Sequence, residues 1–285
     1  MSKQDTIISL LKEIDKNIDN IGGGGNVPKV KVSQLKVSNV CINDDGRWEG
    51  ENIVDFSECI SLSNTFMNTK LKILDTRSWD LSKVNNLDGT FDNCRILEEV
   101  KGIENWNTSS VINLFCFIRG VKTLINKRLD LTKWKVSNVT NVQNFISNSN
   151  IELNIENWDT SKITDFSIMF FQNTSTYANI VGTNAESATK INNMFDGANI
   201  ETIVGDYTLD EVINKNIKVL NGLKINIPNT FGGKNLNRAS LRALINGLAD
   251  LTGQTAQTLT IGETLIAKLT EEDIAIATAK NWTIA

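Results

Sequence analysis

The sequence predicts an α/β repeat protein in which a short strand and a short helix recur every 24–28 residues. Three observations predict this class: a tryptophan that returns at this interval, a serine three residues after it, and an apolar triad with offsets 0, 3 and 7. The clearest copy is W-D-T-S-K-I-T-D-F-S-I-M-F, which begins at Trp158 and carries the triad Ile163, Phe166 and Phe170. A period of this length is typical of proteins built from stacked repeats.

The triads predict the helix of each repeat, and the residues before each tryptophan predict its strand. Triads begin at positions 59, 84, 111, 139, 163 and 191. Their offsets place three side chains on one face of a two-turn helix. The hydroxyl two residues earlier would cap that helix. The predicted caps are Ser82, Ser109, Ser137, Ser161 and Thr189. Alternating buried positions predict short strands; they are Leu74 with Thr76, Leu129 with Leu131, and Leu153 with Ile155.

One such repeat cannot bury its apolar face, whereas stacked copies can. We therefore expect a leucine-rich-repeat-like solenoid over residues 59–204. The four tryptophans, Trp79, Trp106, Trp134 and Trp158, allow two interpretations. They could be a row of sugar-stacking platforms, but their constant place between strand and cap favours a stacked interior ladder. No ligand-contacting residue is therefore assigned.

The composition argues against several classes of partner and activity. The formal net charge is −4 with no basic run, so neither nucleic acid nor a membrane is expected as a partner. There is no histidine, no metal-ligand spacing and no activated nucleophile, so we expect no catalysis, no metal and no cofactor. The cysteines, Cys41, Cys59, Cys94 and Cys116, form no CxxC and are expected to be reduced and structural. We recognise no secretory signal and no membrane span in the sequence.

Residues 1–21 are predicted to form an N-terminal oligomerisation or anchoring helix. Its heptad seam consists of Ile7, Leu11, Ile14, Ile18 and Ile21. Isoleucine fills every d position, which favours three or four strands over two, so we expect a homotrimer. The alternative is a helix packed on its own domain. Against that alternative stands a flexible hinge over 22–27, which contains Gly22, Gly23, Gly24 and Gly25.

The remaining segments are predicted to cap the two ends of the stack. Residues 28–58 form a β-rich entry cap, with a turn at Asp44 to Gly46. Residues 205–285 form a C-terminal α/β capping unit. We expect an amphipathic helix after Asn237 that Gly253 stops, a strand at Leu259 and Ile261, and a second helix. Thr270 to Asp273 begin that helix as a capping box, and the helix dipole explains their acidic residues.

The phrase beginning at Trp158 resembles the repeat of BspA-like leucine-rich-repeat proteins, over about residues 59–200. The sixth copy departs from it, because Glu186 stands in the tryptophan position. The C-terminal A-D-L-T-G-Q-T-A-Q-T-L-T-I-G with L-T-E-E-D-I-A-I-A-T-A-K-N-W-T-I-A is similar to the terminal unit of repeat proteins from phages of gut Bacteroidales. The helix followed by a glycine hinge resembles the attachment end of phage fibres. These resemblances imply a fibre or decoration protein.

Three function classes follow. The first is a non-enzymatic virion fibre or decoration protein. It would be made in the host cytoplasm, held by another virion protein through residues 1–21, and touch host-surface glycan or protein. The second is a protein–protein interaction module or bacterial surface adhesin without a virion role. The third is an enzyme such as a polysaccharide depolymerase, with carboxylates on neighbouring repeats. Sedimentation as a trimer, and binding or degradation of surface polysaccharide, discriminate among them.

Overall fold

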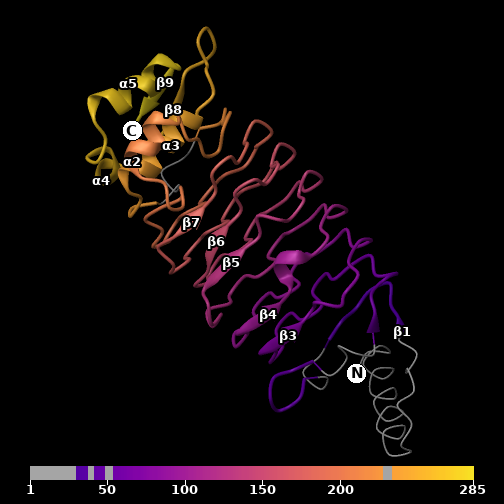
Figure 1. The fold of residues 1–285 in the computed structure, drawn as a ribbon. Coiled ribbons are helices and arrows are strands. Elements are labelled where there is room, and N and C mark those ends of the chain that lie inside the picture. The colour runs from indigo at the N-terminus through magenta and orange to yellow at the C-terminus, as the bar shows by residue number, and fades with distance from the viewer. Residues whose placement is uncertain (1–29, 38–41, 49–53, 227–232) are drawn as a thin grey trace, which may run out of the picture.

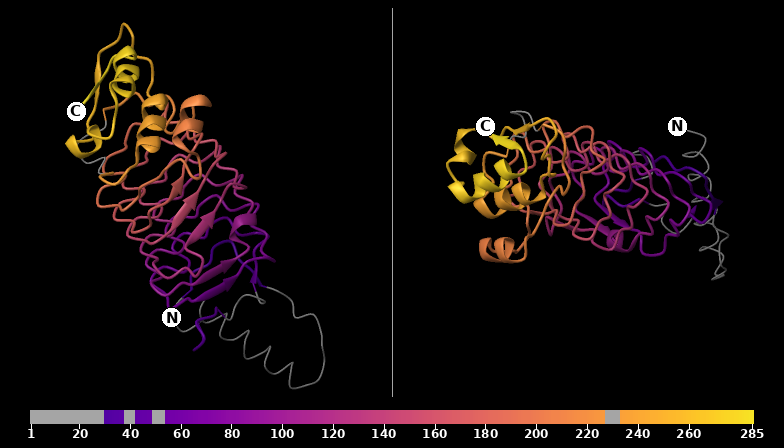
Figure 2. Two further views of the ribbon diagram at one scale, coloured as in Figure 1. Left: turned by 60° about the vertical axis from the view of Figure 1, so that its left-hand side comes forward. Right: turned by 90° about the horizontal axis from the view of Figure 1, so that it is seen from above.

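In the computed structural model of the protein, residues 30–37, 42–48, 54–226 and 233–285 are described. They form an elongated stack of repeats, with a group of helices at its C-terminal end (Figure 1). Figure 2 shows the same arrangement from two further directions. The predicted helix seam (Ile7, Leu11, Ile14, Ile18 and Ile21), the hinge glycines Gly22–Gly25 and Cys41 lie outside the described residues.

Short parallel strands run along one face of the stack, which we call the strand face. They are β1 (Val30–Lys31), β2 (Val54–Asp55), β3 (Ile73–Asp75), β4 (Glu99–Lys101), β5 (Arg128–Asp130), β6 (Glu152–Asn154) and β7 (Ala178–Asn179). The strands pair β1 with β2, β3 with β4, β5 with β6 and β6 with β7, each pair parallel. The strands predicted around Leu74, Leu129 and Leu153 are confirmed, and all three side chains are buried.

A second parallel column joins the repeats on the side away from the strands. One residue of each repeat bridges to the next, in the order Gln34, Ser61, Asn86, Asn113, Asn141, Asp165 and Lys190. From Ser61 to Asp165, the backbone N–H that follows each bridge donates to the next repeat, as from Leu87 to the Asn113 carbonyl (3.1 Å). Hydrogen bonds between neighbouring repeats therefore hold both sides of the stack.

The apolar triads all face inward, as predicted. None of their 18 side chains is more than 4% exposed. They share the interior with a second set of buried aromatic rings just before the third triad position, including Phe117 and Phe145, whose stacked centroids lie 5.6 Å apart. Neither these rings nor the buried Trp48 entered the predicted core.

The helix predicted for each repeat is wrong. Between residues 59 and 204 the described structure contains no α-helix, only the 3-10 turn η2 (Ile103–Asn105). Each triad instead spans two consecutive four-residue turns, because every fourth residue has a positive φ. Examples are Asn64 (53°) with Asn68 (61°), and Asn144 (59°) with Asn148 (53°). An α-helix needs φ near −63° throughout, whereas asparagine and glycine adopt the left-handed region readily. Two such turns give the same 0, 3, 7 burial as two helical turns.

The predicted serine caps are corrected in the same way. At Ser82, Ser109 and Ser161 the residue after the tryptophan accepts a hydrogen bond from the serine N–H. Thr189 donates from Oγ1 to the Thr164 carbonyl (3.2 Å). Ser161 donates from Oγ to the Asp159 carboxylate (2.7 Å), and Ser109 does so to Asn107 Oδ1 (2.8 Å). These local side-chain bonds are the kind that compete with helix formation.

The repeat tryptophans form the interior ladder that their constant position predicted. Trp106, Trp134 and Trp158 are 3–6% exposed, and Trp79 is half-buried. Ring centroids of successive tryptophans lie 6.4, 5.9 and 6.2 Å apart in stacked geometry. The Trp134 Nε1–H donates to the Ile103 carbonyl (2.8 Å), so the polar edge of the ring is satisfied inside the stack. The sugar-platform alternative is excluded for these three buried rings.

The two ends of the stack differ. At the entry end, the turn predicted at Asp44 to Gly46 is present, with Gly46 at φ 76°. The C-terminal end contains α2 (Leu209–Asn214), α3 (Arg238–Gly247), β8 (Gln257–Leu259), α4 (Glu263–Ile266), α5 (Glu271–Ala279) and β9 (Trp282–Ile284). The predicted capping box of Thr270 with Asp273 is confirmed. α3 ends at Gly247, so Gly253 does not stop it.

Helix α3 is the centre of the C-terminal unit. Every residue from Ala239 to Gly247 is buried, so the helix is enclosed on all sides, whereas the sequence predicted an amphipathic one. The Lys280 ammonium closes its C-terminal end by donating to the carbonyls of Ile245, Asn246 and Leu248 at 2.8–3.2 Å. Burial lowers the pKa of Lys280.

Candidate functional site: an opening in the strand face

The strand face is interrupted once among β3 to β7. Strands β3 and β4 form one sheet and β5, β6 and β7 another, with no pairing between β4 and β5. The stack itself continues past this point, because Asn86, Asn113 and Asn141 still bridge in sequence and Trp106 still stacks on Trp134. The two repeats therefore stay joined on the inside and part only on the strand face (Figure 1).

The length of the corner before β5 explains the separation. The strand begins 17 residues after the start of the triad in this repeat (Val111 to Arg128), against 15 for β4 and 13 for β6. The extra residues form a turn in which the Lys127 N–H donates to the Leu124 carbonyl (3.1 Å), with Lys127 at φ 50°. On the other side, Gly102 (φ 84°) leads β4 away into η2. β4 and β5 remain unpaired between these two corners.

The opening is closed at both ends by hydrogen bonds. At one end the Ile125 N–H donates to the Glu98 carbonyl (3.0 Å). At the other end the Trp134 Nε1–H donates to the Ile103 carbonyl (2.8 Å). Between these two bonds lies a hollow of ≈ 620 Å³. Its size falls in the usual range of small-ligand pockets, about 300–1,000 Å³.

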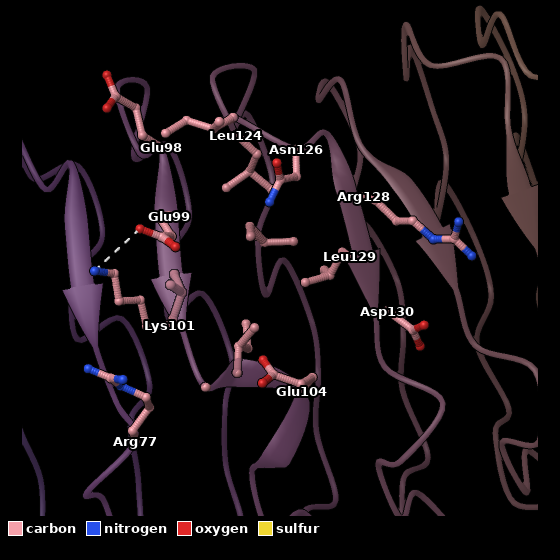
Figure 3. Close-up of a pocket in the computed structure, with 15 residues that line it drawn as sticks. Arg77, Glu98, Glu99, Lys101, Glu104, Leu124, Asn126, Arg128, Leu129 and Asp130 are labelled. Carbon is pink, nitrogen blue, oxygen red and sulfur yellow. Dashed lines mark ion pairs between the residues drawn. The ribbon is translucent and has the colours of Figure 1, made fainter.

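The floor of the hollow is apolar and its rim is charged. Val100, Ile103, Ile118 and Leu129 form the buried floor. Ile125 stands at the rim with 65% of its surface exposed, the largest value among the exposed large hydrophobic residues of the described chain. Figure 3 shows the labelled side chains around the space between β4 and β5.

The rim carries charges of both signs, and most of them are partnered. Lys101 lies 3.8 Å from Glu99, and Glu98 lies 3.1 Å from Lys72. Arg77 pairs with Asp75, and its hydrogen bonds lower the pKa of that carboxyl to about 2. These exposed pairs contribute little to stability but fix where charge is presented.

Arg128 differs from the other cations of the rim. Among the described residues no carboxylate lies within 4 Å of its guanidinium, which stands 5.7 Å from the centre of the Tyr177 ring. Figure 3 shows its side chain directed away from the opening and toward the following strands. A guanidinium and a tyrosine are thus presented together beside the hollow, a combination enriched at protein interfaces.

The family comparison covers this region. The model of a family described as "Mycoplasma protein of unknown function, DUF285" matches residues 60–150 and 120–224, more than half of the chain. The chain belongs to this family. The match agrees with a BspA-like repeat protein. No curated protein and no solved structure matches the chain.

The two DUF285 matches overlap over residues 120–150, which include the Leu124–Lys127 turn and strand β5. The opening therefore lies inside the DUF285 repeats and not at their boundary. Sequence reasoning missed it. The available signals were the long corner between the triad that begins at Val111 and the strand that begins at Arg128, and an isoleucine, Ile125, in a polar stretch.

Among the described residues no three His, Cys, Asp or Glu side chains are grouped so that they could hold a metal ion. The described cysteines Cys59, Cys94 and Cys116 are buried free thiols, and burial raises the pKa of Cys116 to about 12. No helix in the described part of this DUF285 chain is long and apolar enough to cross a bilayer.

Proposed function

We propose that the protein is a non-enzymatic binding and display protein whose repeats form a leucine-rich-repeat-like solenoid. The strand face would contact the partner, centred on the opening between β4 and β5. The observation that carries this proposal is the hollow itself, with its apolar floor, its exposed Ile125 and its charged rim. A pocket with an apolar floor and a few placed polar groups is the usual form of a binding site.

The side of the stack away from the strands offers less to a partner. Its threonine hydroxyls are occupied by the neighbouring repeat: Thr140 donates to the Ile112 carbonyl, and Thr164 to that of Thr140 (3.3 and 3.2 Å). Two isoleucines of the same column, Ile60 and Ile112, are exposed, but neither lines a hollow described here. The strand face presents Arg128, Tyr177 and Ile125 beside the opening. This contrast supports the strand face as the recognition surface.

The more specific proposal is a phage virion fibre or decoration protein. Residues 1–21 would trimerise and attach to another virion protein, and residues 22–27 would let the repeats reach a host-surface glycan or protein. Support for this role comes from the isoleucine seam and from the sequence resemblances described above. The protein would then be made in the host cytoplasm and carried on the virion.

A cellular role is the second candidate. The matching family is described from Mycoplasma, which favours an interaction module or a surface adhesin of a bacterium. Immunogold labelling of phage particles released by producing cells distinguishes the two. Label on particles supports the virion role, and label confined to the cells supports the cellular one.

Binding is tested with matched isoleucine variants. The labelled full chain, Ile125→Ser and Ile112→Ser are compared by flow cytometry on whole cells of gut Bacteroidales strains. Ile112 is also exposed (50%) but lies outside the opening, so its variant is the control. We expect Ile125→Ser to weaken binding by more than about tenfold, because burying an isoleucine contributes about 1.5–3 kcal/mol. Equal binding by both variants would contradict the proposed site.

Assembly is tested with Ile14→Asp, which places carboxylates on the axis of the predicted trimer. Light scattering should give a trimer for the parent and a monomer with folded repeats for the variant. A parent that is monomeric at high concentration would contradict the anchoring proposal and leave the binding proposal standing.

A further inference from the structure

The second left-handed residue of each turn pair forms a column along the stack. Its members are Asn68, Asn93, Gly120, Asn148, Gln172 and Gly197, all with φ between 52° and 75°. Where two asparagines are neighbours, their side chains join, since Asn93 Nδ2 donates to Asn68 Oδ1. The column lies at the corner where the turns lead toward the strands.

Gly120 leaves a place in this column without a side chain. A hollow of ≈ 590 Å³ lies there, bounded by Asn93 on one side and Asn148 on the other. We call it the Gly120 notch. Arg95, Arg119 and Lys122 line it, together with the carboxylate of Asp92.

The single carboxylate of the notch is already fully engaged. Arg119 donates from Nε and Nη2 to the two oxygens of Asp92 (2.8 and 2.7 Å), and the Asp92 side chain is 5% exposed. The pKa of Arg119 is raised by these hydrogen bonds. Asp92 therefore holds Arg119 in place and leaves no exposed negative charge in the notch.

The other two cations have no carboxylate partner. Arg95 Nε donates to Asn93 Oδ1 (2.8 Å), which fixes the guanidinium beside the notch. Within the described residues, no Asp or Glu oxygen lies within 4 Å of Arg95 or Lys122, unlike Lys72, Arg77 and Lys101 on the strand face. The lining thus carries three cations and one carboxylate.

We propose that the Gly120 notch binds an oxyanion: a phosphate or sulfate group, free or carried on a larger ligand. Guanidinium groups present planar pairs of N–H donors that match oxyanions, and an ammonium adds a point charge. Metal cations would be repelled by the net positive lining. The proposal does not rest on the opening between β4 and β5.

The repeats themselves supply the variant that closes the notch. Gly120→Asn reproduces the residue found at Asn93 and Asn148, and asparagine tolerates the left-handed conformation. An added Cβ would meet its nearest atom, the Asn93 Cα, at 3.5 Å, an ordinary contact. Gly197→Asn is the control, because Gly197 (φ 66°) occupies the same column position and does not line the notch. A Cβ there would lie 3.0 Å from Gln172 Cγ, so the end of that side chain must shift.

The experiment follows the arginine Nε–H signals of the ¹⁵N-labelled full chain by NMR at constant ionic strength. Sulfate and inorganic phosphate should shift the Arg95 and Arg119 signals saturably, whereas chloride should not. Arg77, paired with Asp75, is the internal reference. Arg95→Gln should weaken the binding by about tenfold, the usual consequence of losing a hydrogen bond to a charged group. Gly120→Asn should weaken it at least as much, because the added side chain occupies the notch. Gly197→Asn should bind as the parent does.

Dextran sulfate, compared with plain dextran, identifies the source of the oxyanion. Saturable shifts with dextran sulfate that Gly120→Asn loses assign the notch to a polymer-borne group. Shifts with the free ions alone assign it to a free anion. Linear shifts that never saturate, equal shifts of Arg77, or unchanged titration of Gly120→Asn would overturn the proposal.

Discussion

The repeat stack and the C-terminal unit satisfy their buried polar groups in different ways. In the stack, the hydrogen bonds of one repeat go to the next, about 25 residues away, and repeat at regular intervals. In the C-terminal unit, a few charged side chains supply these hydrogen bonds. Asp273 accepts from two arginines, and Lys280 donates to carbonyls at the end of α3. Stability is therefore distributed in the stack and concentrated in the unit.

The largest effect is expected in the middle of the stack. Trp134→Ala removes a ring that stacks on both Trp106 and Trp158, and it frees the Ile103 carbonyl. Truncation of a buried aromatic costs about 3–5 kcal/mol of unfolding free energy. Urea unfolding of the variant, the parent and Trp134→Phe measures it. An unchanged unfolding free energy would show that the tryptophan ladder does not contribute to stability at this repeat.

The corresponding change in the C-terminal unit is Asp273→Asn. The Asp273 carboxylate is 0% exposed and accepts from Arg238 Nε (2.8 Å), Arg242 Nη1 (2.6 Å) and the Thr270 N–H (3.0 Å). Breaking such a pair costs about 3 kcal/mol, because two arginines lose their counter-charge. In hydrogen exchange, we expect the backbone amides of α3 and α5 to lose their protection while those of the repeats keep it. That result would show that the stability of the unit depends on this one carboxylate.

The same carboxylate makes stability depend on pH. Burial raises the pKa of Asp273, but the hydrogen bonds of Arg238, Thr270 and Arg242 outweigh this and lower it below its ordinary value. A carboxylate with a lowered pKa stabilises the fold. This stabilisation is fully present above the unfolded pKa of about 3.9 and decreases as the pH falls below that value. Asp273→Asn should therefore flatten the stability profile between about pH 4 and 2. Parallel profiles for parent and variant would contradict this.

Gly247→Ala reverses the usual helix preference. Alanine in place of a helical glycine normally stabilises by about 1 kcal/mol. At Gly247 an added Cβ would lie 2.1 Å from the Val219 carbonyl oxygen, so α3 must move away from the Val219 segment of the same unit. We expect a loss of about 1–3 kcal/mol, as for other overpacked sites. A more stable variant in thermal unfolding would show that this contact within the C-terminal unit relaxes freely.

The inward-facing residues could be predicted from the sequence because burial depends only on spacing. The six triads and the strands at Leu74, Leu129 and Leu153 are where spacing places them. The backbone conformation between these residues could not be predicted in this way. Two turns with left-handed residues and two helical turns bury side chains at the same offsets of 0, 3 and 7. Asparagine or glycine at most of these positions, as at Asn64 and Asn68, was the signal that separates the two; Cys116, Ile168 and Gln172 are the exceptions.

The candidate site was harder to predict than the core. The opening depends on how a long corner at Leu124 to Lys127 turns β5 away from β4, which is a relation between two repeats. The enclosure of α3 is similar, because its polar residues Arg242 and Asn246 are buried by partners distant in sequence, Asp273 and Ile217. The spacing of residues within one segment therefore predicts neither the separation of β4 from β5 nor the burial of α3.

The smallest effect concerns one hydroxyl between two repeats. Thr76 Oγ1 accepts from the Trp106 Nε1–H (2.8 Å) and donates to the Lys101 carbonyl (2.7 Å), and Thr76 is 2% exposed. Trp134 and Trp158 use backbone carbonyls in the same position, so only Trp106 depends on a side chain. Thr76→Val keeps the shape but leaves the indole N–H without its acceptor, at a cost of about 1–2 kcal/mol.

The matched control for this prediction is Thr140→Val on the other side of the stack. Its hydroxyl is exposed and donates at 3.3 Å to a carbonyl that water can also reach, so the change should stay within about 0.5 kcal/mol. Denaturant unfolding of both variants, with tryptophan fluorescence as the probe, measures the difference. If Thr140→Val costs as much as Thr76→Val, the hydroxyls on the two sides of the stack contribute equally, and the Trp106 contact has no special role.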